Sequence, residues 1–414
     1  MQISFIIINT ERSMKFAFLL TQSLDSPSGL GRFGPLAREF IRLGHQVDLF
    51  ALHYDYSNLE TKSYIDHGVH VNYVGQMHVL KQGPRKTYFR TRQLLSVSMN
   101  STLQLAKALR KSDADIVQIC KPHPMNVLAA HLGARGRPVF CDCDDYEAET
   151  NLFTNKWQKR TVQYFEDGIV DYVSGITVNT RFLFKRYEAL GFPKQHLVYV
   201  PNGAERSRFS VQTHPDKVHN QWGLNSDHLI VLYAGTLGIH SHPVDLLIDA
   251  FAHVCRALPS ARLIIVGSGE DFDLLRDRSR QLDIADFVIF TGRVSPEEIP
   301  DYIAAATVSV DPIKDDLTAK ARSPLKIMES LVLGTPVVTS DVGDRRAILN
   351  DGEYGILVPP GNVQGLSNGL IQILGQPSMR AAMEEAAKNS REQWLWNNLS
   401  EKFLRIFKCA GIDI

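Results

Sequence analysis

The sequence predicts an α/β protein built from two successive Rossmann-like halves, each with a parallel sheet. Apolar runs bounded by turn signals alternate with helical patterns along the chain, which is typical of βαβ units. The alternation pauses at the turn tripeptide Pro201-Asn202-Gly203 and then restarts. The chain of 414 residues is long enough for two domains with separate cores.

The first half is expected to span residues 14–200. Its strands are predicted at 15–20, 46–52, 70–74, 115–120, 138–144, 175–180 and 197–203, and helices near 31–43, 92–110 and 124–133. Residues 1–13 would duplicate the first strand without a loop of their own. We therefore expect Met14 to be the natural start and residues 1–13 to be a peripheral extension.

The second half is expected to span residues 201–387. Its strands are predicted at 229–237, 261–269, 287–292, 308–312, 336–341 and 355–360, and helices at 243–257, 271–281, 296–305, 324–333 and 362–374. Residues 388–414 carry a helical pattern of aromatic and leucine side chains but no strand. This last segment is predicted to form a helix that packs back onto the first domain.

Composition excludes several classes of protein. Lys plus Arg (45) equals Asp plus Glu (45), so no global charge indicates nucleic-acid binding. No segment approaches the length of apolar sequence that spans a membrane, and "ISFIIIN" lacks the basic start of a signal peptide. The five cysteines do not have zinc-site spacing and predict reduced, mostly buried thiols in a cytoplasmic protein.

The segment "RSPLKIMESLVLGTPVV" predicts a helix whose first turn is unexpectedly basic. Ser323 is the expected N-cap, Pro324 fits the first turn and Gly334 fits the C-terminal stop. Lys326 and Arg322 oppose the positive end of the helix dipole. A solvated lysine is the simplest interpretation; an anion bound at the helix start is the alternative that would make these cations stabilising.

A glycine-rich loop follows the first strand and precedes a helix. Gly29 and Gly31 would let a ligand approach the backbone, although tight turns need glycine as well. The glycine spacing is not that of a dinucleotide site, and the second strand does not end in the acidic residue that binds ribose there. A nicotinamide enzyme is therefore not expected.

Three further loops end strands of the second half, where parallel sheets bind ligands. They contain Gly235-Thr236, Gly267-Ser268-Gly269 and Thr291-Gly292-Arg293-Val294. With Arg322 and Lys326 they would form a rim suited to a diphosphate. Glu329 could accept hydrogen bonds from ribose hydroxyls, or could be an ordinary exposed glutamate paired with Lys326.

These motifs together resemble a known family. "GLGRFGPLAREFIRLGHQV", "YVPNG", "LIIVGSGE", "SPLKIMESLVLGTPVV" and "GILVPPGN" are similar to segments of retaining, nucleotide-sugar-dependent glycosyltransferases of family four. The resemblance covers residues 14–410. It implies the GT-B architecture, in which two Rossmann-like domains face each other across a cleft that holds the active site.

The resemblance implies roles for individual residues. The second domain would bind the nucleotide diphosphate-sugar through the helix start Ser323, Pro324 and Leu325, with Glu329 on the ribose. Gly29 and Gly31 would face the diphosphate from the first domain. The other residues implied in donor binding are Gly235, Thr236, Gly267, Gly269 and Val294.

The chain also departs from the family pattern. A glutamate that touches the donor sugar in many members falls at Ala321, and the usual diphosphate-binding cations fall at Thr236 and His242. Arg322 and Lys326, with Lys320, could supply the missing charge. A variant with "SPLK" before the ribose glutamate is recognisable within the family, so an active enzyme is still expected.

An acidic segment, "CDCDDYEAETN", ends a strand of the first half. Its carboxylates could hold a divalent metal or shift one another's pKa values. GT-B enzymes do not usually need a metal for the diphosphate, so neither a metal nor another cofactor is expected. In related enzymes a histidine here contacts the donor sugar; Asp144 or Asp145 takes that place, and Lys121 and His123 of "KPHP" are alternative polar contacts.

One segment has a strong local charge. From His67 to Ser112 there is no Asp or Glu, whereas Lys81, Arg85, Lys86, Arg90, Arg92, Lys107, Arg110 and Lys111 are basic. An ordinary solvated helix, an anionic or lipid-linked acceptor, and an acidic membrane surface all fit this pattern. The predicted location is the cytoplasm, with a peripheral position on the inner membrane surface left open.

The predicted function is transfer of a sugar from a nucleotide diphosphate-sugar to an acceptor hydroxyl with retention of configuration. Arg322, Lys326, Asp145 and His123 are the expected catalytic residues. The alternatives are a non-catalytic sugar-nucleotide or glycan-binding protein, and an epimerase or phosphorylase of the same architecture. The base, sugar, acceptor and linkage are not predicted.

Overall fold

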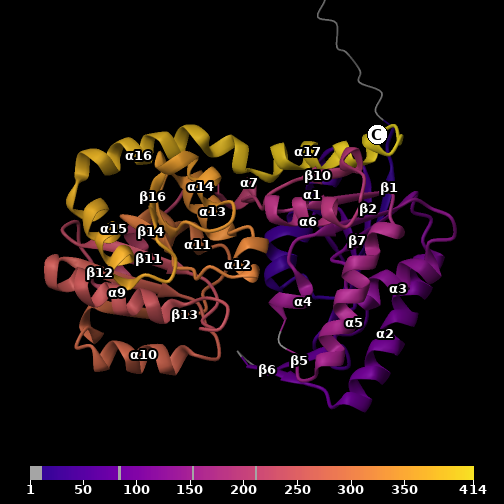
Figure 1. Ribbon diagram of the computed structural model, residues 1–414, viewed down its shortest axis with the longest axis horizontal. Helices are drawn as coiled ribbons and strands as arrows, with labels where there is room; N and C mark the ends of the chain where they lie inside the picture. Colours follow the sequence, from indigo (N-terminus) through magenta and orange to yellow (C-terminus); the bar gives the residue numbers. More distant parts are fainter. Residues whose placement is uncertain (1–11, 83–84, 152, 210–211) are drawn as a thin grey trace, which may run out of the picture.

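The structure is a computed structural model that describes residues 12–82, 85–151, 153–209 and 212–414. The extension expected at residues 1–13 therefore lies almost entirely outside the described residues. The described chain forms two α/β domains that lie side by side (Figure 1). The predicted fold class is confirmed.

The first domain is built on an eight-stranded sheet with the order β10-β9-β8-β7-β1-β2-β4-β3. Its pairings are parallel except that of β3 with β4. The strands are β1 (Lys15–Leu20), β2 (Gln46–His53), β3 (Ser63–Asp66), β4 (Val69–Gln76), β7 (Ile116–Cys120), β8 (Val139–Cys143), β9 (Gly175–Val178) and β10 (Leu197–Tyr199). β7 and β8 are buried at every position because helices cover both faces of the sheet.

The helices of this domain include the three predicted near 31–43, 92–110 and 124–133 and three that were not predicted. They are α1 (Gly34–Arg42), α2 (Thr91–Lys111), α3 (Pro124–Gly133), α4 (Glu147–Thr150), α5 (Lys156–Asp167) and α6 (Arg181–Ala189), with the short turns Gly168–Asp171 and Lys194–His196. The helix expected near residue 31 begins at Gly34, after a π-helical turn. The antiparallel hairpin of β5 (Val79–Gln82) and β6 (Arg85–Tyr88) was not predicted from the sequence.

The second domain has a six-stranded parallel sheet with the order β13-β12-β11-β14-β15-β16. The strands are β11 (Leu229–Ala234), β12 (Ala261–Val266), β13 (Val288–Gly292), β14 (Val308–Asp311), β15 (Val337–Ser340) and β16 (Gly355–Val358). The helices are α7 (Arg206–Phe209), α8 (Pro215–Trp222), α9 (Val244–Ala257), α10 (Phe272–Gln281), α11 (Ile299–Ala305), α12 (Leu317–Ala321), α13 (Leu325–Leu333), α14 (Arg345–Ile348), α15 (Val363–Gly375) and α16 (Pro377–Ser390), with short turns at Ala285–Phe287 and Asn350–Gly352.

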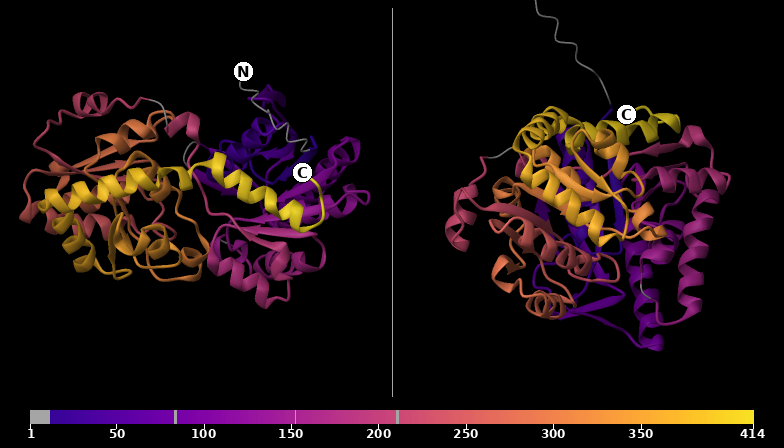
Figure 2. Two further views of the ribbon diagram at one scale, coloured as in Figure 1. Left: turned by 90° about the horizontal axis from the view of Figure 1, so that it is seen from above. Right: turned by 60° about the vertical axis from the view of Figure 1, so that its left-hand side comes forward.

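The chain crosses between the domains twice, and the two crossings run side by side. The Ala204 N–H donates to the carbonyl of Trp394 (2.8 Å), and the Trp396 N–H donates to the carbonyl of Ala204 (3.0 Å). After the second crossing, which follows the turn Arg391–Trp394, α17 (Trp396–Cys409) lies over the first domain while α16 lies on the second (Figure 2).

Aromatic packing holds α17 on the first domain. The ring of Phe407 lies 4.6 Å from that of Phe140 and 5.2 Å from that of Phe16, between ring centroids. Phe403 packs edge-on against Phe40 of α1. None of the described helices combines the length and hydrophobicity of a membrane span.

Candidate active site between the two domains

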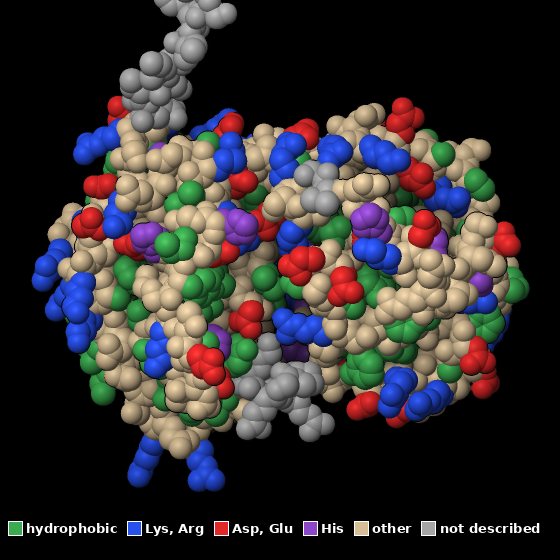
Figure 3. Space-filling model, turned by 180° about the vertical axis from the view of Figure 1, so that it is seen from behind, with side chains coloured by type: hydrophobic (Ala, Val, Ile, Leu, Met, Phe, Trp, Pro, Cys, Tyr) green, Lys and Arg blue, Asp and Glu red, His purple; other side chains and the backbone are tan. Residues whose placement is uncertain are grey.

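The glycine loop after β1 lies at the interface between the domains, because Gly31 approaches Leu325 of the second domain. Figure 3 shows a hollow between the two halves of the molecule. It contains the π-helical turn Gly29–Phe33. A Cβ atom at Gly29 would lie 2.5 Å from the carbonyl oxygen of Leu24, and one at Gly31 would lie 2.6 Å from Cδ2 of Leu325 in the second domain. A side chain at Gly29 would therefore clash with backbone, whereas one at Gly31 would require the Leu325 side chain to move.

A buried arginine fixes this loop to the crossing between the domains. Arg32 is 1% exposed and pairs with both carboxylate oxygens of Asp142, with N···O distances of 2.5 and 2.7 Å. Its remaining guanidinium nitrogen donates to Oδ1 of Asn202 (3.0 Å). The Trp396 indole N–H donates to the carbonyl of Gly31 (3.2 Å). Sequence analysis missed this network.

Ser323 contacts the same crossing and does not cap the helix. The backbone N–H of Asn202 donates to the Ser323 hydroxyl, and its side-chain amide donates to the Ser323 carbonyl, both at 3.0 Å. Pro324 occupies the N-cap position and α13 begins at Leu325, so the predicted serine cap is wrong. The hydroxyl instead accepts a hydrogen bond from the crossing between the domains. Gly334 ends the helix with φ 80°, as predicted.

Lys326 meets an anion that belongs to the protein itself. Its ammonium donates to Oδ1 of Asp311 (2.9 Å) and lies 5.0 Å from the centre of the Tyr233 ring. Nε of Arg345 donates to the other oxygen of Asp311 (2.9 Å). Burial opposes ionisation of Asp311, but the two cations lower the pKa of its carboxyl below the usual range. Two cations thus share one carboxylate, which leaves a net positive charge at the end of β14.

Arg322 reaches from the second domain to the first. Its Nη1 lies 3.3 Å from both the carbonyl oxygen of Ser241 and Nε2 of His242, and its Nε lies 3.7 Å from Oδ1 of Asp145. Burial, reinforced by Lys326 and Arg322, lowers the pKa of His242 well below its usual value, so the imidazole is neutral. A cation is thus held where the resemblance implies the diphosphate.

Backbone contacts explain two glycines of the strand-end loops. Gly267 has φ 139°, and a Cβ there would lie 1.9 Å from the carbonyl oxygen of Gly235. A Cβ at Gly269 would lie 2.1 Å from the carbonyl oxygen of Leu237. The adjoining Thr236 is exposed. These glycines are needed for loop packing whether or not a ligand also approaches them.

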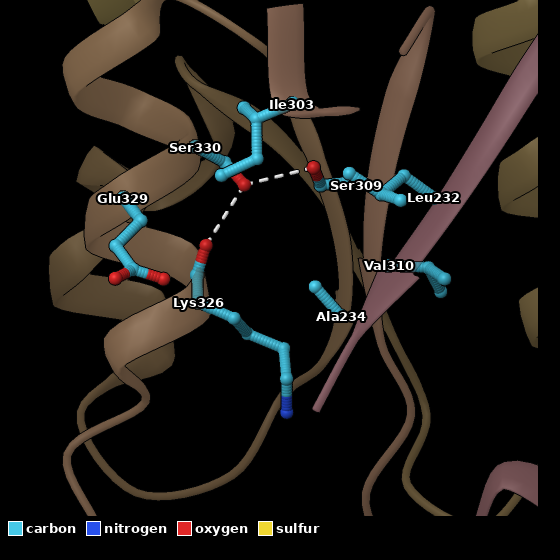
Figure 4. Close-up of a pocket in the computed structure, with 8 residues that line it drawn as sticks. All are labelled: Leu232, Ala234, Ile303, Ser309, Val310, Lys326, Glu329 and Ser330. Atoms are coloured by element: carbon cyan, nitrogen blue, oxygen red, sulfur yellow. Dashed lines mark hydrogen bonds between the residues drawn. The ribbon is translucent and has the colours of Figure 1, made fainter. Parts of the chain in front are cut away.

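Glu329 is a buried carboxylate without a partner in the described part of the chain. It is 8% exposed and accepts no hydrogen bond there. Burial raises the pKa of Glu329 to about 7, although Arg208 and Lys326 act in the opposite direction. Figure 4 shows Glu329, Lys326 and Ser330 on one helix beside a small cavity. Val294 is half-buried in the apolar cluster that underlies this helix.

The acidic segment of the first domain surrounds a lysine. The ammonium of Lys121 lies 3.0 Å from Oδ1 of Asp144, 2.8 Å from Oδ2 of Asp145 and 2.9 Å from Oε1 of Glu147. Lys121 is 3% exposed and has φ 77°, a strained conformation for a residue other than glycine. Oxygens of the three carboxylates lie within 4.8 Å of one another, as in a metal site, but the ammonium already bridges them. The arrangement does not fit a metal while Lys121 is there.

The carboxylates of this cluster differ in protonation. Burial raises the pKa of Asp144 to about 7, against the opposing effect of Lys121. Burial also tends to raise the pKa of Asp145. Lys121 and Arg322 have a larger, opposite effect, so the pKa of Asp145 is lowered below its usual value. Asp145 is therefore the carboxylate of this cluster that faces the second domain as an anion.

His123 lies beside this cluster. Its ring stacks on that of His78 at a centroid distance of 4.9 Å. Burial and the neighbouring charge of Lys121 lower the pKa of His123 to about 4, so the imidazole is neutral near pH 7. The structure thus places His123 and Asp145 just beyond the carboxyl ends of the central strands β7 and β8, with Arg322 of the second domain opposite Asp145.

Comparisons with known proteins find a family model that matches each of the two domains. The model of the glycosyl transferase 4-like domain matches residues 31–203, and that of the glycosyl transferases group 1 matches residues 215–390. The phosphatidyl-myo-inositol mannosyltransferase of Mycolicibacterium smegmatis is 23% identical over 97% of this chain and 96% of that protein.

Two further proteins extend the comparison. A GDP-mannose-dependent alpha-(1-6)-phosphatidylinositol monomannoside mannosyltransferase of the same organism is 26% identical over 53% of this chain, and the match spans 58% of that relative. The structure of a sucrose-phosphate synthase from Thermosynechococcus elongatus has the same fold, with a TM-score of 0.76 at 18% identity over 95% of this chain and 98% of that one. The chain is therefore a glycosyltransferase of family four with the GT-B architecture.

Proposed function

We propose that this glycosyltransferase uses a nucleoside diphosphate-sugar and transfers the sugar to an acceptor hydroxyl with retention of configuration. The observation that carries the proposal is the charge at the start of α13. Arg322 and Lys326 lie there beside the glycine loop, where Gly31 touches Leu325. One of the relatives described above is GDP-mannose-dependent, which supports a donor of this class.

In this proposal the site acts mainly by electrostatic stabilisation of the departing diphosphate. The bond between the anomeric carbon and the diphosphate oxygen breaks, and its electron pair remains on the diphosphate. Arg322 and Lys326 stabilise that growing negative charge, and the N–H groups at the start of α13 add to their effect. Glu329 accepts hydrogen bonds from the ribose hydroxyls when it is ionised.

The simplest route to retention of the anomeric configuration is attack by the acceptor on the same face of the sugar that the diphosphate leaves. Lys121 and Arg322 hold the carboxylate of Asp145 and lower its pKa, which makes Asp145 a poor nucleophile for a double displacement. Ala321 offers no carboxylate either, since its side chain is a methyl group, which is fully buried in the apolar cluster of the first domain. The acceptor oxygen bonds to the anomeric carbon while its proton passes to the departing phosphate oxygen.

The acceptor lies on the first-domain side of the site. Asp145 and the neutral His123 are placed there to orient its hydroxyl groups. One relative is named as a mannosyltransferase of phosphatidyl-myo-inositol. A lipid-linked polyol or an anionic glycan is the acceptor class we propose.

Calorimetric titration with UDP, GDP, ADP and TDP tests the donor site. We expect one nucleotide to bind selectively, and the matching sugar nucleotide to be hydrolysed slowly. Arg322→Ala should weaken diphosphate binding about tenfold or more, in line with a hydrogen bond between charged groups. The control Arg346→Ala removes an exposed cation of the same domain and should change nothing.

These titrations distinguish a transferase from a non-catalytic binding protein and test where the diphosphate binds. Selective binding without turnover, even with acceptor extracts, would indicate a non-catalytic binding protein. Equal binding by wild type and Arg322→Ala would show that the diphosphate does not lie at this helix start. Proton NMR of the transferred sugar reports its anomeric configuration and tests retention directly.

A further inference from the structure

Exposed apolar side chains concentrate on one part of the first domain. Among the described residues, thirteen large apolar side chains are exposed, and seven of them lie on α2, α3 and α5. They are Leu95, Met99, Leu103, Leu128, Leu132, Trp157 and Tyr164. The three helices pack side by side over the sheet, so that these residues form one surface, here called the outer helical face (Figure 1).

The exposed residues of α2 form a stripe. Leu95, Met99 and Leu103 are spaced four residues apart and are 54%, 67% and 54% exposed. The same helix buries Leu105 and Leu109 against the sheet. α2 therefore has one apolar side that the fold uses and a second that no described residue covers. Patches of this kind mark interaction surfaces.

The outer helical face is also cationic. α2 and α3 contain no Asp or Glu. The exposed cations of this face are Arg92, Lys107, Arg110, Lys111, Lys156 and Arg160, and none forms an ion pair with a described carboxylate. In the second domain, by contrast, each arginine of α10 pairs with an aspartate. The charge of the outer helical face is therefore available to an anionic partner.

The outer helical face borders the candidate active site. α3 begins directly after Lys121 and His123, and α5 follows the acidic cluster that contains Asp145. Leu95 and Trp157 lie near the first turns of α2 and α5. A partner on this face would sit next to the acceptor side of the site.

We propose that the outer helical face binds the surface of an anionic lipid bilayer. Leu95, Met99 and Trp157 enter the boundary between head groups and acyl chains, while the cations contact the anionic head groups. Exposed apolar side chains interspersed with unpaired cations suit this interface. The bilayer then delivers a lipid-linked acceptor to the neighbouring site, a consequence that rests on the proposed function.

Sedimentation of the full chain with phosphatidylcholine vesicles, with and without phosphatidylglycerol, tests the proposal. We expect binding only with phosphatidylglycerol. Leu95→Glu/Met99→Glu should weaken it by at least about tenfold, because two apolar anchors are replaced by charges that the surface repels. Arg92→Gln and Lys107→Gln should each weaken it roughly fivefold. The matched control Leu274→Glu/Arg276→Gln on α10 should bind like wild type.

Trp157 provides a second readout, since its ring is 42% exposed. Phosphatidylglycerol-containing vesicles with brominated acyl chains should quench its fluorescence, and Trp157→Phe should abolish that change. Absence of quenching, or full binding by Leu95→Glu/Met99→Glu, would overturn insertion of this face. Failure of the wild type to bind anionic vesicles, with retention on polyglutamate, would indicate an acidic protein partner instead.

Nucleotide binding without vesicles separates this proposal from the proposed function. Leu95→Glu/Met99→Glu should keep the nucleotide affinity of the wild type, because the outer helical face is in the other domain. A chain that binds nucleotide but no vesicle would overturn only the membrane proposal. A chain that binds vesicles but no nucleotide would overturn only the donor site.

Discussion

The two domains place opposite charge clusters at the strand ends that face each other. In the first domain the single ammonium of Lys121 meets three carboxylates. In the second domain the single carboxylate of Asp311 meets the two cations Lys326 and Arg345. Both clusters are buried, yet one has excess negative charge and the other excess positive charge.

The opposite charges of the two clusters favour different substrates on the two sides of the site. A diphosphate is attracted to the second domain, whose cations exceed their internal partner. It is repelled by the first domain, whose carboxylates exceed theirs, and neutral acceptor hydroxyls can lie there. Arg322 and Asp145 are the charged pair that joins the two clusters.

The largest expected effect comes from breaking the first cluster. Lys121→Met leaves three carboxylates without their shared cation and should lower the free energy of unfolding by about 3–5 kcal/mol at about pH 8. Without the ammonium, the folded-state pKa values rise above those of the unfolded chain. The loss of stability should therefore shrink as the pH falls and the folded protein takes up protons.

Urea unfolding at several pH values measures this effect. Lys159→Met is a matched control because Lys159 pairs with Glu149 near the same cluster but is 41% exposed. That change should cost less than about 1 kcal/mol. Equal stability losses in the two variants would contradict the role given to Lys121.

Breaking the second cluster should have a smaller cost and should change ligand binding. Asp311→Asn leaves the buried Arg345 without its counter-charge and should lower the free energy of unfolding by about 3 kcal/mol. Removing the internal anion also leaves more positive charge for a diphosphate. The preferred nucleoside diphosphate should therefore raise the melting temperature more than in wild type.

Thermal unfolding with and without the nucleotide tests this prediction. The control Asp341→Asn removes the exposed partner of Arg346 and should alter neither stability nor the nucleotide shift. A smaller nucleotide shift in Asp311→Asn than in wild type would mean that Asp311 positions Lys326 for the ligand.

The sequence predicted the strands of both sheets except β3, because the others are short apolar runs between turn signals, whereas β3 is largely exposed. β7 and β8 are read correctly from local composition alone. The hairpin of β5 and β6 was missed because it is short and polar and lies outside the main sheets. The C-terminal stop of α13 was visible because Gly334 adopts the left-handed conformation that glycine favours.

The sequence named candidate site residues, whose roles remain predictions, but it did not predict their pairings. Lys326 was expected to be solvated, to bind an external anion or to pair with Glu329, whereas it pairs with Asp311, fifteen residues earlier. Arg32 and Asp142 are 110 residues apart, and no local pattern links them. An acidic residue at the end of the strand "VSVD" was the available signal for Asp311. Which side chain it meets depends on how the helices return to the sheet.

Glu329→Gln should have opposite effects on stability and on nucleotide binding. The folded-state pKa of Glu329 is raised to about 7 by burial, so the ionised carboxylate destabilises the free protein above that pH. The variant should gain about 1 kcal/mol of stability near pH 8 and bind the nucleotide about tenfold more weakly. In wild type the affinity should fall as Glu329 is protonated below about pH 7.

Calorimetry across this pH range, together with urea unfolding, tests both signs. The affinity of Glu329→Gln should no longer show this step near pH 7. A wild-type affinity without that step would contradict the contact between Glu329 and the ribose. A variant that binds like wild type would place the nucleoside elsewhere.

The smallest expected effect comes from the link between the clusters. Asp145→Asn removes the carboxylate that competes with a diphosphate for Arg322, at an N···O distance of 3.7 Å. Because Arg322 is partly exposed, the pair contributes less than about 1 kcal/mol, and nucleotide affinity should rise about two- to fivefold. Higher salt should reduce this gain. A loss of nucleotide affinity would mean instead that Asp145 holds Arg322 in its binding position, so that the clusters cooperate where we expect them to compete.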